Sequence, residues 1–325
     1  MYLEGAFMQI LITIPVTEKE MAGFHAAAPE AEFMCVQNPN VTEEMIAASD
    51  IIIGNVPTGK IKASPRLKFL QLNSAGSNEY CVPGVLSPDT ILCNATGAYG
   101  VALAEHMLAQ ILMLIKKLNM YEENRKNHIW HDEGDVAGIY GSTTLVIGAG
   151  DIGTEFGRRM SARGSRVIGI RRHKVEPADY MAASGTMEDI DRFLPEADFV
   201  ACALPATKET YHLFDMERIG RMKKTAVLAN IGRGNLIETE VLAEALKNHM
   251  IAGACIDVTD PEPLPKDSIL WDCPNLILTP HISGFYHLRH TYNRIIEIAC
   301  GNLSAFLSGG ELINQVDFET GYRKF

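Results

Sequence analysis

Positive charge is scarce in this chain of 325 residues, because 29 Lys and Arg stand against 40 Asp and Glu, a net charge of −11. An acidic protein repels nucleic acid and anionic membrane surfaces, so we expect neither as a partner. A site for an anionic ligand must therefore be built locally, from single Arg or Lys side chains or from backbone N–H groups.

Cysteine pairs and metal-binding patterns are also lacking. The seven cysteines are odd in number, scattered along the chain and without a CxxC pair. This pattern indicates reduced thiols in a cytoplasmic protein rather than a disulfide framework. The sequence has no HExxH, no Cys/His cluster with zinc spacing and no GxSxG, so we expect no metal and no hydrolase elbow.

Segments for targeting or membrane insertion are missing as well. The N-terminal stretch MYLEGAFMQILITIP has no basic region and no small-residue cleavage site, which argues against a secretory signal. Met8 remains open as an alternative start. The most apolar long segment, residues 101–115, is interrupted by Glu105 and His106, too early for a membrane span.

Short apolar runs recur along the chain with helical patterns between them. Ile152, Phe156 and Met160, for example, share one helix face. The runs are continuous rather than alternating, which indicates strands buried on both faces of parallel sheets. Such alternation of strand and helix is typical of an α/β fold. The predicted strands are 8–14, 32–36, 50–55, 68–72, 143–148, 166–170, 198–204, 225–230, 252–258 and 275–279.

The strands fall into two series, which predicts two Rossmann-like doubly wound parallel sheets with a cleft between the domains. A long helix at 101–118 and a polar stretch at 119–140 separate the series. A last helix at 291–308 leads to GGELINQVDF, which we expect to return a strand to the first domain. The prediction is a discontinuous substrate-binding domain, 1–100 with 290–325, and a dinucleotide-binding domain, 101–289.

The stretch TTLVIGAGDIG places Gly148, Gly150 and Gly153 in GxGxxG spacing between a strand and a helix. This context is typical of a loop that holds a dinucleotide pyrophosphate at a helix N-terminus, although a tight turn without ligand stays open. Asp151 and Ile152 lie within the same loop. An NAD site usually has Asp or Glu after the next strand, whereas this chain has Arg171 and Arg172, which favours NADP with NAD still possible.

Three further residues follow predicted strands at the same sheet edge: Arg233 in NIGRGN, Glu262 in DPEPLP and His281 in TPHISG. A guanidinium forks onto a carboxylate, an imidazole titrates near neutrality, and a carboxylate beside imidazolium favours the charged ring and fixes its orientation. Singly, each is equally compatible with a surface ion pair or a solvated loop. Together they suit hydride transfer to a 2-keto acid, with His281 as general acid.

Over nearly its full length the chain resembles the D-isomer-specific 2-hydroxyacid dehydrogenase family. The matching stretches are VALAEHMLAQILML, GAGDIG, ANIGRGNLIETEVLAEAL, AGACIDVTDPEPLP, NLILTPHISG and GNLSAFLSGGELINQVD. The resemblance implies that Arg233, Glu262 and His281 are catalytic, with Arg233 and His281 also contacting substrate and cofactor. It implies a substrate-carboxylate loop at Ser74, Ala75, Gly76 and Ser77, and further cofactor contacts at Leu204, Pro205, Thr210, Ile231, Gly232, Asp257, Ser283 and Gly284.

The resemblance leaves the substrate open among glyoxylate, hydroxypyruvate, pyruvate and bulkier 2-keto acids. The arginines at 171 and 172 follow the glyoxylate and hydroxypyruvate reductase branch, and Glu262 argues against the formate dehydrogenases, which have glutamine there. Tyr286, His287 and His290 either shape the pocket or cap the last helix. We expect a cytoplasmic homodimer with the arm 119–140 in its interface. A dinucleotide-sensing binding protein is the alternative; a methyltransferase would leave the three strand-end residues unexplained.

Overall fold

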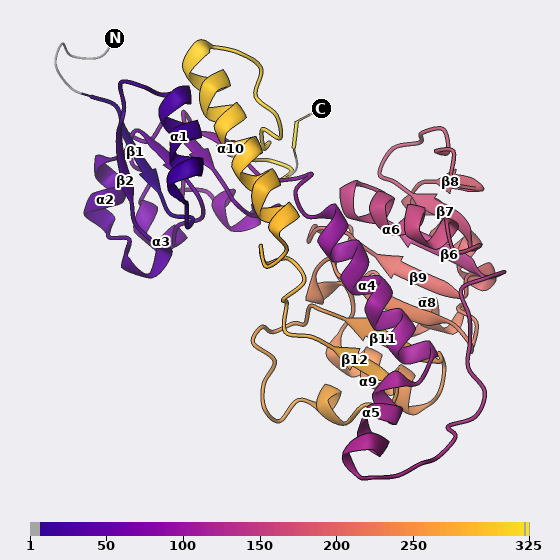
Figure 1. The fold of residues 1–325 in the computed structure, drawn as a ribbon. Coiled ribbons are helices and arrows are strands. Elements are labelled where there is room, and N and C mark those ends of the chain that lie inside the picture. Colours follow the sequence, from indigo (N-terminus) through magenta and orange to yellow (C-terminus); the bar gives the residue numbers. More distant parts are fainter. Residues whose placement is uncertain (1–6, 322, 325) are drawn as a thin grey trace. The chain divides into compact units, whose positions relative to one another are not determined.

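The computed structural model describes residues 7–321, 323 and 324. The chain forms two compact units, one of which combines the residues up to Tyr99 with those from Tyr286 onward, while the other is Gly100–Phe285 (Figure 1). Each unit contains one sheet in which all strand pairs are parallel. The two strand orders are β2-β1-β3-β4-β5 and β12-β11-β10-β9-β6-β7-β8. The predicted pair of doubly wound parallel sheets is therefore confirmed.

The first unit is a five-stranded sheet with helices on both faces. Its strands are β1 (Gln9–Ile12), β2 (Glu32–Cys35), β3 (Ile51–Ile53), β4 (Phe69–Gln71) and β5 (Ile91–Cys93). Its helices are α1 (Glu18–Ala27), α2 (Glu43–Ala48), α3 (Thr58–Ile61) and α10 (Arg289–Ser308). Helix α10 packs on α1 and on the sheet, where the ring of Phe306 stacks on Phe69 with centroids 4.9 Å apart.

The second unit is the seven-stranded sheet. Its strands are β6 (Thr143–Ile147), β7 (Arg166–Ile170), β8 (Ala183–Gly185), β9 (Phe199–Cys202), β10 (Val227–Asn230), β11 (Gly253–Ile256) and β12 (Leu276–Leu278). Its helices are α4 (Gly100–Ile115), α5 (Leu118–Lys126), α6 (Asp151–Ser161), α7 (Ile190–Phe193), α8 (Met216–Gly220) and α9 (Thr239–Lys247). The strand order reverses between β6 and β9, which is where open α/β sheets bind their ligands.

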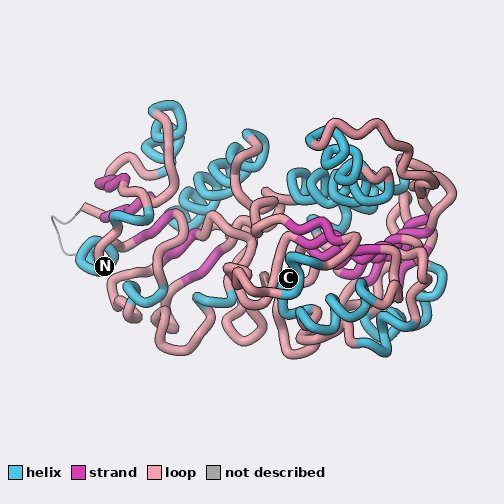
Figure 2. Tube along the Cα trace, turned by 90° about the horizontal axis from the view of Figure 1, so that it is seen from below, coloured by secondary structure: helices cyan, strands magenta, loops and turns pink. Residues whose placement is uncertain are grey.

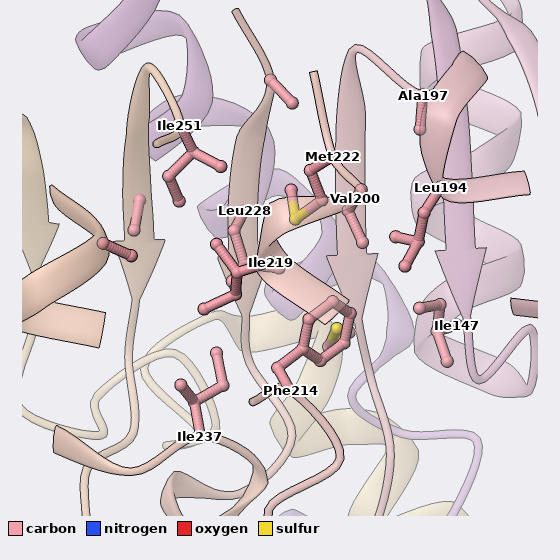
Figure 3. Packing of buried hydrophobic residues seen from close by; sticks show 14 of the residues in the cluster. Ile147, Leu194, Ala197, Val200, Phe214, Ile219, Met222, Leu228, Ile237 and Ile251 are labelled. Atoms are coloured by element: carbon pink, nitrogen blue, oxygen red, sulfur yellow. The ribbon is translucent and has the colours of Figure 1, made fainter. Parts of the chain in front are cut away.

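Continuous apolar strands explain why both faces of each sheet are covered, as Figure 2 shows for the layers of helices about the strands. Every residue of β9, β10 and β11 is buried. On one face of the second sheet, Phe214, Ile219 and Met222 pack near Val200 and Leu228 (Figure 3). The edge strand β2 differs, because three of its four residues are exposed.

All ten predicted strands contain an observed one, but β5 and β8 were not predicted. Strand β8 reads ASG and has no apolar run to detect. The predicted helix 101–118 ends at Ile115, because Lys117 adopts a left-handed conformation (φ 56°) from which α5 begins. The tail returns to the first sheet as an isolated antiparallel bridge between Gln315 and Cys93. Within the described residues, no helix is long and apolar enough to cross a membrane.

Candidate active site

The predicted acid–base residues follow three neighbouring strands of the second unit. Arg233 comes after β10, Glu262 after β11 and His281 after β12, and these strands are adjacent and parallel. The carboxyl ends of parallel strands meet at one sheet edge, so the three residues lie at the same edge.

The structure brings Glu262 and His281 into direct contact, with 2.7 Å between the carboxylate Oε2 and the ring Nδ1. The other carboxylate oxygen, Oε1, accepts the backbone N–H of Thr259 at 3.0 Å. Glu262 is thereby anchored to its own loop, in which the peptide bonds before Pro261 and Pro263 are cis. With Nδ1 on the carboxylate, the ring keeps Nε2 for another partner. About half of each side chain is solvent-accessible, 46% for His281 and 37% for Glu262.

The loop that carries His281 is held by Asp257. His281 has a left-handed backbone (φ 50°), and its N–H donates to the Asp257 carbonyl at 2.7 Å. The Asp257 carboxylate, 1% exposed, accepts the N–H groups of Ile282 and Ser283 at 3.0 and 3.1 Å and the Ser283 hydroxyl. Asp257 and Ser283 were predicted to contact cofactor; the bonds observed here join Asp257, which follows β11, to the loop that carries His281.

Arg233 lies between two glycines that let backbones approach closely. A Cβ on Gly232 would lie 2.3 Å from the Leu204 carbonyl oxygen, and one on Gly234 would lie 2.0 Å from that of Thr259. Asn230 holds this turn, since its amide donates to the Arg233 carbonyl and accepts the Gly232 N–H.

Burial lowers the pKa of the Arg233 guanidinium, and the negative charge of Glu262 opposes this shift. Arginine nevertheless remains protonated in proteins. A half-buried guanidinium near Glu262 is therefore a fixed cation at this edge of the sheet.

The glycine-rich loop lies between β6 and α6, at the reversal of strand order. Gly148 has φ 93°, and a Cβ there would lie 2.5 Å from the Ala203 carbonyl; a Cβ on Gly153 would lie 2.3 Å from the Gly148 carbonyl. A Cβ on Gly150 meets nothing within 4 Å, so the turn is open there. The first N–H groups of a helix lack intrahelical acceptors. An open turn and these N–H groups fit a pyrophosphate.

Asp151 and Ile152 of this loop are both half-buried. Asp151 begins α6 and its carboxylate lies against Gly100 of α4, where a Cβ would be 2.7 Å from Oδ1. Ile152 is half-buried in the first turn. Beyond β7, Arg171 is half-buried and donates its backbone N–H to Gly185 at 3.0 Å, while the side chain of Arg172 is exposed.

The remaining predicted cofactor contacts lie after β9, β10 and β12. Thr210 is 4% exposed, and its hydroxyl donates to the Pro205 carbonyl at 2.7 Å, so it closes the loop after β9. Ile231 is buried and continues β10 by donating its N–H to the Cys202 carbonyl at 3.0 Å. Gly284 is half-buried, and a Cβ there would meet nothing within 4 Å.

The predicted carboxylate-binding loop, Ser74 to Ser77, belongs to the first unit and follows β4. The carbonyls of residues 73–76 are all bonded within that unit. Their donors are the hydroxyl of Tyr99, the N–H of Ala95 (2.9 Å), the amide of Asn94 (2.9 Å) and the hydroxyl of Ser74 (2.7 Å).

Unlike the carbonyls, not all N–H groups of this loop have a hydrogen-bond partner among the described residues. Those of Asn73 and Ser74 donate to the side-chain oxygen of Asn55 at 3.0 and 3.3 Å. Those of Ala75, Gly76 and Ser77 meet no acceptor among residues 7–321, 323 and 324. These three consecutive N–H groups are donors available to an anion.

Sequence reasoning missed the residues that hold these loops, namely Asn55, Asn94, Tyr99, Thr279 and Gln110. The two asparagines lie just after β3 and β5, and this position was the available signal. His106 was interpreted as structural, and its ring contacts the Thr279 hydroxyl at 2.9 Å.

Comparison with known proteins agrees with these features. Residues 108–283 match the family model described as "D-isomer specific 2-hydroxyacid dehydrogenase, NAD binding domain". A glyoxylate/hydroxypyruvate reductase B of Pectobacterium carotovorum is 32% identical over 280 residues, covering 83% of this chain and 86% of the relative.

Solved structures share the fold. A D-isomer specific 2-hydroxyacid dehydrogenase family protein of Aeromonas salmonicida has a TM-score of 0.85 and 29% identity, covering 96% of this chain and 100% of that one. An NADPH-dependent glyoxylate/hydroxypyruvate reductase of Sinorhizobium meliloti, in complex with NADP and sulfate, has a TM-score of 0.81 and 24% identity, with coverages of 97% and 100%. The chain belongs to the D-isomer specific 2-hydroxyacid dehydrogenase family, whose members are NAD(P)-binding oxidoreductases.

Proposed function

We propose that this protein reduces a small 2-keto acid to the D-2-hydroxy acid with NADPH. The contact between Glu262 and His281 carries the proposal, because it orients an imidazole next to a fixed guanidinium at the ligand-binding edge of a nucleotide-binding sheet. A bound nicotinamide supplies a hydride. The residues of the chain must then bind the keto acid and provide one proton.

His281 is the proton donor in this proposal. Its Nδ1 is engaged with Glu262, so Nε2 transfers the proton to the substrate oxygen as the carbonyl becomes an alkoxide. The contact with Glu262 fixes the orientation of the ring. One hydride and one proton convert the C=O group to CHOH, and the ring is left neutral until it takes a proton from solvent.

Arg233 binds the substrate in this proposal, and the loop 74–77 of the first unit is a separate candidate site for an anion. The guanidinium of Arg233 contacts the carboxylate and polarises the adjacent carbonyl. The three open N–H groups of Ala75, Gly76 and Ser77 suit carboxylate oxygens. A 2-keto carboxylate offers both acceptors, which is why this substrate class fits better than a simple aldehyde or ketone.

The cofactor preference rests on Arg171 and Arg172, which stand where an acidic residue would exclude a 2′-phosphate. The Pectobacterium relative is named for glyoxylate and hydroxypyruvate, which supports small 2-keto acids as substrates. The Sinorhizobium protein holds NADP, but at 24% identity it supports only the fold.

We also propose that two copies associate through the second unit. Between residues 118 and 140 several large apolar side chains are exposed, including Leu118 (53%), Ile129 (52%) and Trp130 (104%). A surface of this kind is typical of an interface. Light scattering after size-exclusion chromatography should give twice the 35.7 kDa chain mass, and Trp130→Ser should shift it toward the monomer.

A panel of 2-keto acids tests the function, with NADPH and NADH each followed by absorbance. Glyoxylate and hydroxypyruvate should be reduced fastest, and NADPH should give the higher kcat/KM. Tight binding of NADPH without turnover of any 2-keto acid would instead support a dinucleotide-sensing protein.

A further inference from the structure

Thr279 lies at a junction between helix α4 and the loop that carries His281. It follows β12 directly and continues the ladder by donating its N–H to the Ile256 carbonyl at 3.0 Å. Its hydroxyl oxygen lies 2.5 Å from Asp257 Oδ1, 2.9 Å from His106 Nε2 and 3.0 Å from Gln110 Nε2.

Counting hydrogens fixes the direction of these three bonds. A hydroxyl has one hydrogen and two lone pairs. The Asp257 carboxylate can only accept, so the Thr279 hydrogen goes to it. Gln110 and His106 must then donate to the lone pairs, which means that His106 presents Nε2–H. The hydroxyl of Thr279 is thereby fully used, with one bond in each available direction.

Asp257 passes this restraint to the loop 280–284. Its carboxylate is 1% exposed and accepts the backbone N–H groups of Ile282 and Ser283, while its carbonyl accepts that of His281. A buried carboxylate turns toward the donors that surround it, since unmet hydrogen bonds of a buried charge are costly. The Thr279 hydroxyl is one of these donors, on the same oxygen, Oδ1, that accepts from Ile282.

Helix α4 is a firm anchor for the junction. It has 16 residues, packs on α6, β11 and β12, and buries Gln110 at 5% exposure. His106 and Gln110 are four residues apart, so they lie on the same helix face and reach the same hydroxyl.

We propose that Thr279 is a positioning residue that ties α4 to Asp257 and thereby holds His281 against Glu262. The inference rests on the proposed function for its effect on rate. The structural part of the proposal, that Thr279 restrains residues 280–284, requires no assumption about the substrate.

Thr279→Val tests this, because valine keeps the shape and removes the hydroxyl, while Thr279→Ser keeps the hydroxyl. Hydrogen exchange of the Ile282 and Ser283 amides should quicken about tenfold in Thr279→Val and return to within about threefold of wild type in Thr279→Ser. With a 2-keto acid and NADPH, kcat should fall about tenfold in Thr279→Val, with the Kd of NADPH nearly unchanged. The melting temperature should also fall, because the buried Asp257 carboxylate loses one donor.

A double-mutant cycle separates positioning from general destabilisation. If Thr279 acts through the His281–Glu262 contact, Thr279→Val should lower kcat less than about twofold in a Glu262→Gln background. An equal fall of kcat in both backgrounds would overturn the proposal. Wild-type amide exchange and wild-type kcat in a folded Thr279→Val would overturn it as well.

If Thr279→Val does not fold, His106→Leu provides a second test because it removes one donor to the Thr279 hydroxyl. Hydrogen exchange of the Ile282 and Ser283 amides should then become faster in His106→Leu, with His106→Gln as the conservative match. If the wild-type protein turns over no 2-keto acid, the proposed function is refuted. The amide-exchange measurements then still test whether Thr279 restrains residues 280–284.

Discussion

Replacing Glu262 with glutamine removes one charge and almost no volume. The amide oxygen of the new side chain can still accept the Thr259 N–H, which Glu262 Oε1 now accepts at 3.0 Å. What is lost is both the negative charge and the acceptor 2.7 Å from His281 Nδ1, because the amide NH2 group takes the place of Oε2. The variant therefore removes the contact with His281 and keeps the bond of residue 262 to its own loop.

The magnitude follows from distance and exposure. The two side chains are 46% and 37% exposed, so a water-like dielectric applies. Two unit charges about 3 to 4 Å apart then interact by about 1 to 1.4 kcal/mol. Loss of a Coulomb interaction of that size corresponds to a roughly five- to tenfold lower kcat/KM for keto acid reduction.

Steady-state kinetics with a 2-keto acid and NADPH measure this loss, and NADPH binding should remain unchanged. Glu244→Gln, at an exposed position of α9, removes the same charge elsewhere and serves as the control. The reasoning would be refuted if Glu262→Gln retained wild-type kcat/KM, or if it lost no more than Glu244→Gln.

Three further predictions address cofactor, substrate and stability. Arg171→Asp should weaken NADPH binding about 10- to 150-fold and NADH binding less than threefold, with Arg163→Asp, two residues beyond the C-terminus of α6, as control; equal losses for both cofactors in titration would contradict the preference. Asn94→Asp replaces the donor to the carboxylate loop by an acceptor and should raise KM for the keto acid about tenfold at unchanged NADPH affinity; an unchanged KM would remove the loop from substrate binding. Burial raises the pKa of Cys93 to about 12 and of Cys300 to about 11, while unfolded thiols ionise near about 8.5. Their linkage contribution to stability is thus complete below about pH 8.5 and lost as pH rises toward those values, so the melting temperature should fall above about pH 9, and less so in Cys93→Ala; equal falls would contradict it.

The sheets could be predicted because their central strands are apolar without interruption. Val227 to Asn230 and Gly253 to Ile256 are buried throughout, and uninterrupted hydrophobic runs of this kind identify buried strands in a sequence. Strand β8 escaped prediction because its three residues pair by backbone alone, and α5 because its sequence, LNMYEENRK, has no buried face. Local pattern thus found most of the strands that build the cores, but it also missed β5, a strand of only three residues in which Leu92 and Cys93 are buried.

The same contrast holds for the candidate site. Residues at strand ends, such as Glu262 and His281, could be predicted to share one edge because parallel strands align their carboxyl ends. The bonds that hold the loops join residues far apart in sequence, such as Gln110 with Thr279 and Asn55 with Ser74. No regular spacing in the sequence predicts such contacts, because the packing of the folded chain decides which side chains meet.

The most direct test of the central claim, that His281 delivers the proton that completes keto acid reduction, is a single-turnover comparison of wild type with His281→Ala. Protein loaded with NADPH is mixed with hydroxypyruvate, and the absorbance decay and the configuration of the product are recorded. We predict that wild type gives only the D-2-hydroxy acid, and that His281→Ala slows the decay about 10²- to 10⁴-fold while binding NADPH as tightly. Decay at the wild-type rate in His281→Ala would contradict the account.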